Sequence, residues 1–360
     1  MAGFLLQDIS IEGVACAVPS QIVETTEFYT QFGQEAVDSF IKMTGVKKTH
    51  RTREEQTASD LCYVAAKDLL VKKCVEPASI GALVFVSQTP DYRLPATAAV
   101  LHKRLGLPKD CMAFDVNLGC SGFVYGLNIA GSLMQTSNIQ NALLLCGDTC
   151  IKTASSEDKS AIMLFGEAGS ATLLSRKIGK EISGDLKTDG EGFKAIIMPS
   201  GAYRNRNGSV ERIAWGDGIV RNDYESYMNG TDVFSFSISE VPAQMKAFLA
   251  AQKTTLESYD KLVMHQANLM ILKQIARKIK FPMEMIPVSL DRYGNTSSAS
   301  IPLTLCDTYA EKSRGEKRLL LAGFGIGLSW GVVDVTLDTE NILPIIATDE
   351  YYTEGALTND

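Results

Sequence analysis

The sequence predicts an α/β fold with a parallel sheet, built from two copies of one module. Short apolar runs of strand length alternate with longer helical stretches, which is the pattern of an α/β chain. The second half of the chain repeats the order of landmarks found in the first half. The chain has 360 residues, of which 45% are hydrophobic, and is therefore long enough to bury a large core.

The elements of the first half follow in the order expected of such a module. Residues 83–87, 142–146 and 170–174 are apolar and short, so we expect them to be strands. Residues 96–105 and 121–135 are longer and are expected to be helices. The second of these helices has apolar or small residues on nearly every face, which predicts burial on all sides.

Three landmarks of the first half recur in order in the second half, which indicates an internal duplication. We place the halves at residues 1–180 and 181–340, followed by a C-terminal tail at residues 341–360. Outside the repeat, residues 201–230 are rich in Gly, Asn, Arg and Asp, which predicts a long loop or lid beside a pocket. The paired landmarks are 83–89 with 262–268, 115–121 with 291–297, and 165–171 with 324–330.

Composition excludes several classes of protein. Mean hydropathy of +0.02 excludes disorder for most of the chain, and no apolar run approaches the length of a membrane span. The net charge of −7 argues against nucleic acid and anionic membranes as partners. The N-terminus lacks the features of a secretory signal, so a cytoplasmic location is expected. With three histidines and eight scattered cysteines, we expect reduced thiols and no metal site.

Cys120 is the strongest chemical signal in the sequence. It lies between Gly119 and Gly122, at the start of the predicted buried helix. Glycines permit a sharp turn there and a close approach of substrate. The unpaired N–H groups and the positive dipole end of a helix start favour a thiolate over a thiol. We therefore predict that Cys120 is a nucleophile; the alternative is a small buried cysteine.

His265 and Asn295 are the candidate partners of this nucleophile. Each follows a predicted strand of the second half, at a landmark of the repeat. Cys120 lies at such a landmark in the first half, and a duplicated fold brings these strand ends to one seam. The structural alternatives are a hydrogen-bonded histidine and a turn asparagine.

Together, these motifs resemble the β-ketoacyl synthase III family of condensing enzymes over residues 9–337, which is nearly the whole chain. The resemblance implies a thiolase-like five-layer αβαβα fold, internally duplicated, and a homodimer. The motifs that carry it lie at 44–46, 119–122, 165–166, 265–268, 294–302 and 323–327.

The resemblance also implies a reaction. Cys120 would accept an acyl group from a starter thioester, and a malonyl thioester would lose CO2 and attack this acyl group to give a β-ketoacyl thioester. The Nε2 atom of His265 and the amide of Asn295 would hold the thioester oxygen on which enolate charge develops. The backbone N–H groups of Cys120 and Ile326 would form the oxyanion hole. No permanently bound cofactor is implied, and the substrates would be thioesters of coenzyme A or phosphopantetheine.

Further positions follow from the resemblance. One of the substrate-binding residues would close the acyl pocket of the partner subunit, and an acidic acyl carrier protein would dock on a basic helix face. The alternative for that face is simple exposure to solvent. The implied substrate-binding residues are Leu94, the one reaching the partner, with Lys159, Asn268 and Phe324; the implied carrier-protein patch is Lys273, Arg277 and Lys278.

Other functions were weighed against condensation. A thiolase uses a second cysteine in its last glycine-rich turn, and residues 323–327 contain none. A papain-like protease has Cys, His and Asn in the same order but different surrounding sequence. An acyltransferase that passes the acyl group to an alcohol or amine stays open, because Ser39, Lys159 and Met43 replace family residues that bind coenzyme A and because the 201–230 loop is long. The starter acyl group, its carrier (coenzyme A or carrier protein), and fatty acid initiation versus a specialised pathway also stay open.

Overall fold

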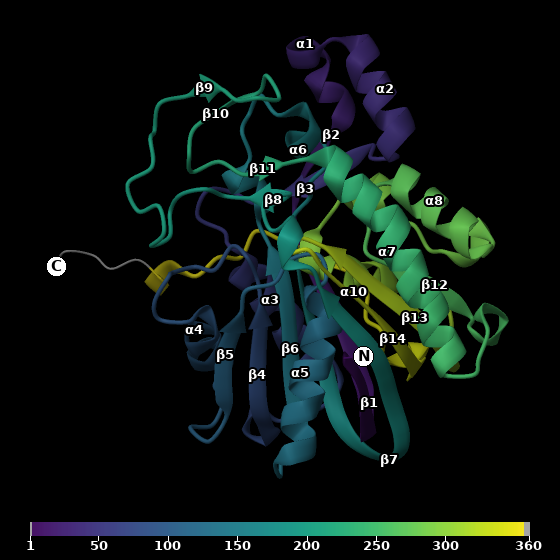
Figure 1. The fold of residues 1–360 in the computed structure, drawn as a ribbon. Helices are drawn as coiled ribbons and strands as arrows, with labels where there is room; N and C mark the ends of the chain where they lie inside the picture. Colours follow the sequence, from purple (N-terminus) through teal and green to yellow (C-terminus); the bar gives the residue numbers. More distant parts are fainter. Residues whose placement is uncertain (1, 356–360) are drawn as a thin grey trace.

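The computed structural model describes residues 2–355, and these form one hydrogen-bonded mixed sheet with helices on both faces (Figure 1). Within the described residues, the sheet has nine strands in the order β12-β13-β14-β7-β6-β4-β5, with β1 beside β7 and β15 beside β1. The strands are β1 (Ala2–Pro19), β4 (Ile80–Val86), β5 (Met112–Val116), β6 (Asn141–Asp148), β7 (Ala168–Thr188), β12 (Lys261–Met264), β13 (Glu316–Gly325), β14 (Ser329–Asp338) and β15 (Ile346–Thr348).

Two long strands join the halves of this sheet. β1 and β7 pair antiparallel, from Ala17 opposite Gly169 to Gly3 opposite Asp185. The first part of β7, residues 168–175, also pairs with β6, whereas residues 182–188 pair with β14. The predicted boundary at residue 180 therefore lies inside β7, where the strand passes from one half of the sheet to the other.

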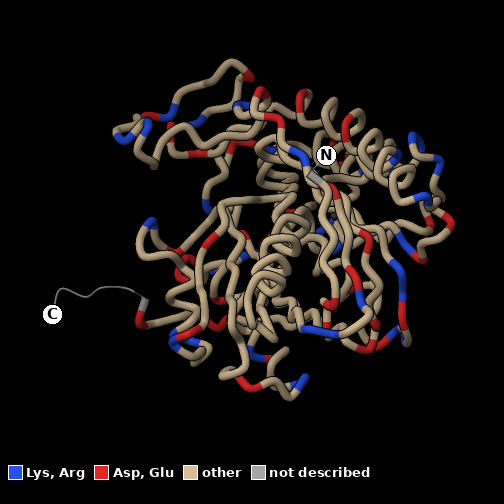
Figure 2. The backbone as a smooth tube through the Cα atoms, turned by 60° about the horizontal axis from the view of Figure 1, so that its bottom comes forward, with Lys and Arg blue, Asp and Glu red and all other residues tan. Residues whose placement is uncertain are grey.

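The two halves of the sheet, joined by β1 and β7, form two layers, and helices form three more, so the predicted five-layer thiolase-like fold is confirmed. α5 (Gly122–Thr136) and α10 (Ser300–Tyr309) lie in the middle, where α5 contacts β4 and β6 as well as β13 and β14. α3 (Ala58–Lys72) and α4 (Thr97–Arg104) cover one outer face, and α7 (Gly230–Ala251) and α8 (Leu269–Ile279) cover the other. Charged residues lie mainly on the outer parts of the chain (Figure 2), and α5 contains none.

The strand pairings confirm the predicted duplication. β4 is parallel to β6 as β12 is parallel to β13, and β6 is antiparallel to β7 as β13 is antiparallel to β14. The predicted strands and helices of the first half are also found, within β4, β6 and β7 and as α4 and α5. The predicted tail begins with β15, which pairs parallel to β1; its last part, after residue 355, lies outside the described residues.

Shorter elements surround one end of the sheet. Residues 198–229, which include all but the last residue of the predicted loop, form an extended segment with only two-residue strands, and Gly230 begins α7. None of the helices in the described part of the chain is both long and apolar enough to cross a bilayer. The short elements are α1 (Tyr29–Phe32), α2 (Gln34–Thr44), α6 (Lys159–Ile162), α9 (Leu290–Tyr293), β2 (Gln21–Glu24), β3 (Lys48–Arg51), β8 (Ile196–Ile197), β9 (Ile213–Ala214), β10 (Val220–Arg221) and β11 (Tyr227–Met228).

Candidate active site

Cys120 lies on the turn between β5 and α5. Ser121 is the residue before the first turn of α5, and the helix begins at Gly122, as the sequence predicts. The end of β13 comes very close to this turn: a Cβ atom built on Gly325 would lie 2.7 Å from the Cβ atom of Cys120 and 3.0 Å from its Sγ atom. Only a glycine at position 325 leaves the thiol this room.

His265 follows β12 and is held on both sides. Its N–H group donates to the carbonyl of Ala322 on β13 at 2.8 Å, so the strand pairing continues through it. The Nδ1 atom of its ring forms a hydrogen bond of 2.7 Å with Ser300 Oγ at the start of α10. The edge of its ring contacts Phe324, with 5.5 Å between the ring centroids. The side chain is 1% exposed, so its orientation is fixed.

Asn295 lies on the turn that precedes α10. Its N–H group donates to the carbonyl of Leu164 at 2.9 Å, and its own carbonyl accepts from Gly166 at 3.1 Å. Its Oδ1 atom accepts a hydrogen bond of 3.0 Å from the N–H group of Ser297, which fixes the side-chain amide. Ser297 has a left-handed backbone, with a φ of 49°, and its Oγ atom lies 4.0 Å from Cys120 Sγ.

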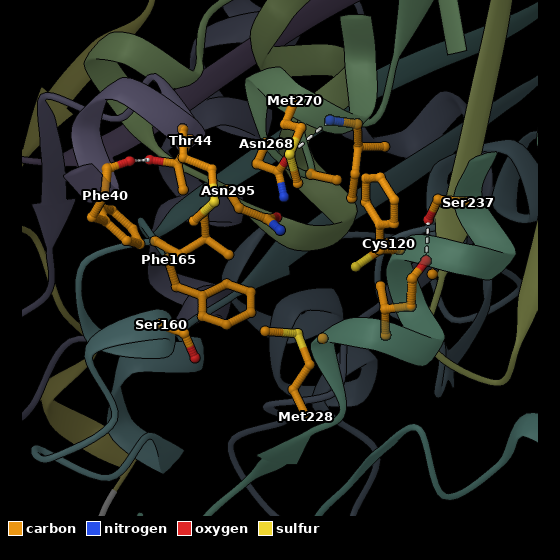
Figure 3. Close-up of a pocket in the computed structure, with 18 of the residues that line it drawn as sticks. Phe40, Thr44, Cys120, Ser160, Phe165, Met228, Ser237, Asn268, Met270 and Asn295 are labelled. Carbon is orange, nitrogen blue, oxygen red and sulfur yellow. Dashed lines mark hydrogen bonds between the residues drawn. The ribbon is translucent and has the colours of Figure 1, made fainter. Parts of the chain in front are cut away.

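The cavity that these elements enclose has a volume of about 380 Å³, and Cys120, His265 and Asn295 all line it. Figure 3 shows the sulfur of Cys120 and the amide of Asn295 pointing into the same space. Most of the wall is apolar, and Lys159 is its one charged side chain among the described residues. Other lining residues are Phe40 and Met43 of α2, Ser160 of α6, Ile196 of β8, Met228 of β11, Val233 and Phe234 of α7, and Met270 and Ile271 of α8.

The protein around Cys120 holds it as a thiol in the resting state. The pKa of Cys120 is raised from 9.0 to about 11, first by desolvation and second by the carboxylate of Asp148. Hydrogen bonds from the Ser297 side chain and from the N–H groups of Ile326 and Cys120 itself act in the opposite direction. The net shift corresponds to about 3 kcal/mol, more than the ~2 kcal/mol that a helix end supplies at most. The expectation that the helix start yields a thiolate is therefore not met.

The imidazole of His265 is neutral at physiological pH. Burial lowers its pKa from 6.5 to about 3, and a backbone hydrogen bond with Ser297 only partly offsets this effect. A neutral ring has one N–H donor and one acceptor. His265 can thus offer a hydrogen bond into the cavity without bringing a positive charge.

A buried carboxylate, missed by the sequence analysis, connects these parts. Asp148, at the end of β6, is 1% exposed. Its Oδ1 atom accepts from the N–H group of Gln88 at 2.7 Å and from Ser87 Oγ at 3.3 Å. Its Oδ2 atom accepts from Ser298 Oγ at 2.6 Å and from the Ser298 N–H group at 3.2 Å. Asp148 therefore ties the end of β4 to the turn that carries Asn295.

The sequence analysis also did not identify Ser297, Ser298 and Ser300 as part of the site, although they lie within the recognised motif at residues 294–302. Their signal was a run of hydroxyl side chains directly after Asn295. A second thiol, Cys150, also lies near the site: it forms a hydrogen bond with Ser297, and its pKa is raised by burial and by the neighbouring Asp148 and Cys120.

The remaining predicted residues divide into two groups. Asn268, Phe324 and Lys159, implied to bind substrate, line the cavity. Leu94 does not: its side chain is 76% exposed, outside the cavity of its own chain. The α8 basic face, defined here as Lys273, Arg277 and Lys278, is exposed and makes no ion pair with any residue between 2 and 355.

The part of the chain described holds no group of His, Cys, Asp or Glu side chains placed to bind a metal ion.

The duplicated five-layer fold, with a cysteine, a neutral histidine and an asparagine around one apolar cavity, defines the class: a thiolase-like condensing enzyme. Comparison with known proteins gives the family. The family model of 3-oxoacyl-[acyl-carrier-protein (ACP)] synthase III matches residues 114–190, and the model of its C-terminal part matches residues 249–337.

Curated relatives cover nearly all of the chain. β-Ketoacyl-[acyl-carrier-protein] synthase III of Clostridioides difficile is 31% identical over 324 residues, or 89% of this chain and 96% of that protein. The protein of the same name from Alkalilimnicola ehrlichii is 33% identical over 325 residues, with 89% and 97% covered. The crystal structure of a 3-oxoacyl-(acyl-carrier protein) synthase from Burkholderia xenovorans has a TM-score of 0.91 at 36% identity, with 96% and 99% covered. The chain belongs to the β-ketoacyl-[acyl-carrier-protein] synthase III family.

Proposed function

We propose that this chain joins an acyl group, carried as a thioester on Cys120, to a malonyl thioester with loss of CO2. The product is a β-ketoacyl thioester. The observation that best supports this proposal is that Cys120, His265 and Asn295, from three distant segments, line one apolar cavity. The names of the curated relatives agree with this reaction.

The first step transfers the starter acyl group. The sulfur of Cys120 attacks the carbonyl carbon of the starter thioester, and the carrier leaves as a thiol that takes the proton of Cys120. The N–H groups of Ile326 and Cys120, which bond the sulfur in the resting site, are close enough to hold the carbonyl oxygen as it becomes negative. Because the thiol pKa is about 11, the proton leaves Cys120 as the sulfur attacks, not before.

The second step breaks and forms carbon–carbon bonds. The bond to the malonyl carboxylate breaks, CO2 departs, and the electron pair moves into the thioester as an enolate. This step uses the tautomer in which Ser300 donates to Nδ1. The Nε2 atom of His265 then carries the ring proton and donates to the enolate oxygen, together with the amide of Asn295. The enolate carbon then attacks the acyl group, and Cys120 leaves. Apolar walls favour this step, because a carboxylate loses CO2 more readily when it is poorly solvated.

Substrate delivery depends on α8. Met270 and Ile271 of this helix line the cavity, whereas the α8 basic face points outward. An acidic acyl carrier protein bound to that face would present its phosphopantetheine arm to the cavity, which Lys159, Asn268 and Phe324 line. We therefore propose carrier-protein docking on α8. Either coenzyme A or a carrier protein would deliver the starter, and the reaction needs no resident cofactor.

The proposed assembly is a homodimer that acts in the cytoplasm. Leu94 is 76% exposed in the single chain, and β5 is an edge strand of the sheet within the described residues. Pairing of two chains along this edge would cover both and would bring Leu94 to the acyl pocket of the partner. Fatty acid initiation and a specialised lipid or polyketide pathway both fit this site.

The test measures CO2 release from a malonyl thioester by the enzyme and by His265→Ala and Asn295→Ala. Loss of one such donor is expected to lower kcat by about 10²–10³-fold. Both variants should still load an acyl group on Cys120. Ser237→Ala is the matched control, since Ser237 lines the same cavity but bonds only its own helix, at Val233. Undiminished CO2 release by both variants would overturn the assigned roles. Acyl transfer to an alcohol or amine with no CO2 release by the wild type would overturn condensation itself.

A further inference from the structure

One wall of the cavity depends on an arginine that is completely buried. Arg221, in the long segment 198–229, has a side chain that is 0% exposed. Its Nη1 atom donates to both carboxylate oxygens of Asp217, at 2.9 and 2.8 Å, and its Nη2 atom donates to Asp158 at 2.6 Å. Its guanidinium group also lies 5.8 Å from the ring centroid of Trp215 and 5.5 Å from that of Tyr227.

This arrangement compensates a buried positive charge. Removing a guanidinium group from water is costly unless carboxylates and hydrogen bonds replace the water. Here two carboxylates do so, and two aromatic rings contact the planar group, an arrangement that a lysine cannot reproduce. The partners of Arg221 are therefore held in one relative position, because moving any of them away would leave a charged group buried without its partner.

Asp158 connects Arg221 to the cavity, because it also caps α6. The Oδ1 atom of Asp158 accepts hydrogen bonds from the N–H groups of Ser160 and Ala161, at 3.0 and 3.2 Å, and so caps α6. Its other oxygen binds Arg221. Lys159 and Ser160, in the first turn of α6, line the cavity. Arg221 thus contacts the residue that sets where this short helix begins.

Through Tyr227, Arg221 also acts on a second part of the wall. Tyr227 stacks on Trp215, with 5.8 Å between ring centroids, and is followed by Met228 in β11. β11 pairs with β8, where Met228 is opposite Ile196. Met228 and Ile196 both line the cavity. In Figure 1, α6, β8 and β11 lie side by side at the end of the sheet.

We propose that Arg221 is a positioning residue that holds residues 196–228 as a fixed wall of the substrate cavity and thereby sets its affinity for the pantetheine arm of a thioester. The identity of that ligand rests on the function proposed above. Arg221 itself does not reach the cavity; it acts through Asp158 on α6 and through Tyr227 on β11. The segment that the sequence predicts to be a loop or lid is then a wall held in place through Arg221.

Arg221→Gln tests this proposal. The variant keeps hydrogen-bonding groups but loses the charge and the fork that bridges the two carboxylates. We expect the KM for an acyl-pantetheine substrate to rise at least tenfold while kcat changes less than threefold. Alkylation of Cys120 by iodoacetamide should keep its rate, because this small reagent needs no ordered wall. Chymotrypsin, whose aromatic sites in residues 198–229 none of these substitutions removes, should cut within this segment faster than in the wild type. Arg221→Lys should give an intermediate KM.

Arg206→Gln is the matched control, since Arg206 is an exposed arginine of the same segment and should change neither the KM nor the cleavage. An unchanged KM in Arg221→Gln together with an uncut segment would overturn the proposal. Equal losses of substrate affinity and Cys120 alkylation would also overturn it, because they would indicate general disruption. If Arg221→Gln does not fold, Asp217→Asn removes one of the two carboxylates and is judged by the same readouts.

Binding of an acyl-pantetheine by calorimetry separates this proposal from the proposed function. A wild-type protein that binds no pantetheine thioester would contradict the proposed function, whereas the cleavage of residues 198–229 would still report on the clamp. A wild type and an Arg221→Gln variant that bind it equally well would contradict only the role of Arg221.

Discussion

Asp148→Asn is the perturbation whose effect on the site can be worked out furthest from the structure. The carboxylate of Asp148 is buried, and it raises the pKa of Cys120. It also accepts the two hydrogen bonds that hold Ser298, three residues after Asn295. Asparagine has nearly the same shape but no charge, and its NH2 group cannot accept from the Ser298 N–H group. The variant should therefore change Cys120 and Asn295 in different ways.

The magnitude follows from the pKa of the thiol. At pH 8, a pKa of about 11 leaves about one Cys120 in a thousand as thiolate. Burial is the largest cause of this pKa and Asp148 the second, so we expect the variant to recover about one of the two pKa units. The thiolate fraction then rises about tenfold, but each thiolate becomes less nucleophilic as its pKa falls. With a Brønsted coefficient of about 0.45, alkylation at pH 8 should be about three- to fourfold faster.

Catalysis should change in the opposite direction. The buried N–H group of Ser298 loses its acceptor, which costs about 1–3 kcal/mol, and the turn that holds Asn295 loosens. We expect kcat for condensation to fall by about tenfold or more.

The assay follows iodoacetamide alkylation of Cys120 by mass spectrometry between pH 7 and 11, in parallel with CO2 release. Asp185→Asn is the control. Asp185 is a buried carboxylate on β7 that accepts from Gln244 of α7 and lies outside the cavity lining, so its variant should leave the alkylation profile unchanged. A midpoint that stays in place or moves to higher pH in Asp148→Asn would refute the electrostatic reasoning. Unchanged kcat would refute the positioning role.

Three further predictions concern other parts of the molecule. Gly325→Ala should abolish acyl loading, because its Cβ atom would lie 2.7 Å from that of Cys120; intact-mass analysis with an acyl donor measures this. The pKa of His265 is 6.5 in the unfolded chain but about 3 in the folded one, so protonation below pH 6.5 favours the unfolded state. The free energy of unfolding should therefore fall with pH below 6.5, by up to about 1.4 kcal/mol per pH unit. Urea unfolding of the wild type and of His265→Gln from pH 7 to 4 measures this. Reversal of all three charges on the α8 basic face should lower kcat/KM at least tenfold for malonyl carrier protein but less than threefold for malonyl-pantetheine, in steady-state assays.

Each of these predictions has its own contradicting result. Normal acyl loading in Gly325→Ala would show that the turn around Cys120 accommodates a methyl group; Gly216→Ala, with open space around its Cβ position, is the control for substitution itself. Equal pH slopes of the free energy of unfolding for the wild type and His265→Gln would show that His265 titrates normally. Equal effects on both malonyl substrates would place carrier-protein docking elsewhere.

The fold was predictable because its determinants are periodic. Runs such as residues 83–87 and 142–146 are too short and too apolar for anything but buried strands, and the repeated landmarks fix the order of both halves. The boundary between the halves could not be placed with the same certainty, because β7 continues through it. Residues 176–180, the polar stretch on which this boundary rests, are the largely exposed middle of β7 and not a linker.

The site was predictable only in part. Cys120, His265 and Asn295 carry local motifs, and the duplication explains why they meet. Asp148 has no such motif, because its role depends on four donors from segments that only the fold brings together. The pKa of Cys120 was misjudged for a similar reason: the helix start is visible in the sequence, but the desolvation that outweighs it comes from packing. Arg221 likewise looks like any loop arginine until its burial is known.

The central claim is that Cys120 carries the acyl group and that a malonyl thioester removes it with loss of CO2. Intact-protein mass spectrometry tests both parts, after mixing the enzyme with acyl-coenzyme A and acyl carrier protein donors of several chain lengths. We predict a mass gain equal to the acyl group, absent in Cys120→Ala, that disappears on addition of malonyl carrier protein while an equimolar amount of CO2 is released. An adduct that persists in Cys120→Ala, or one that malonyl thioester does not discharge, would contradict the account.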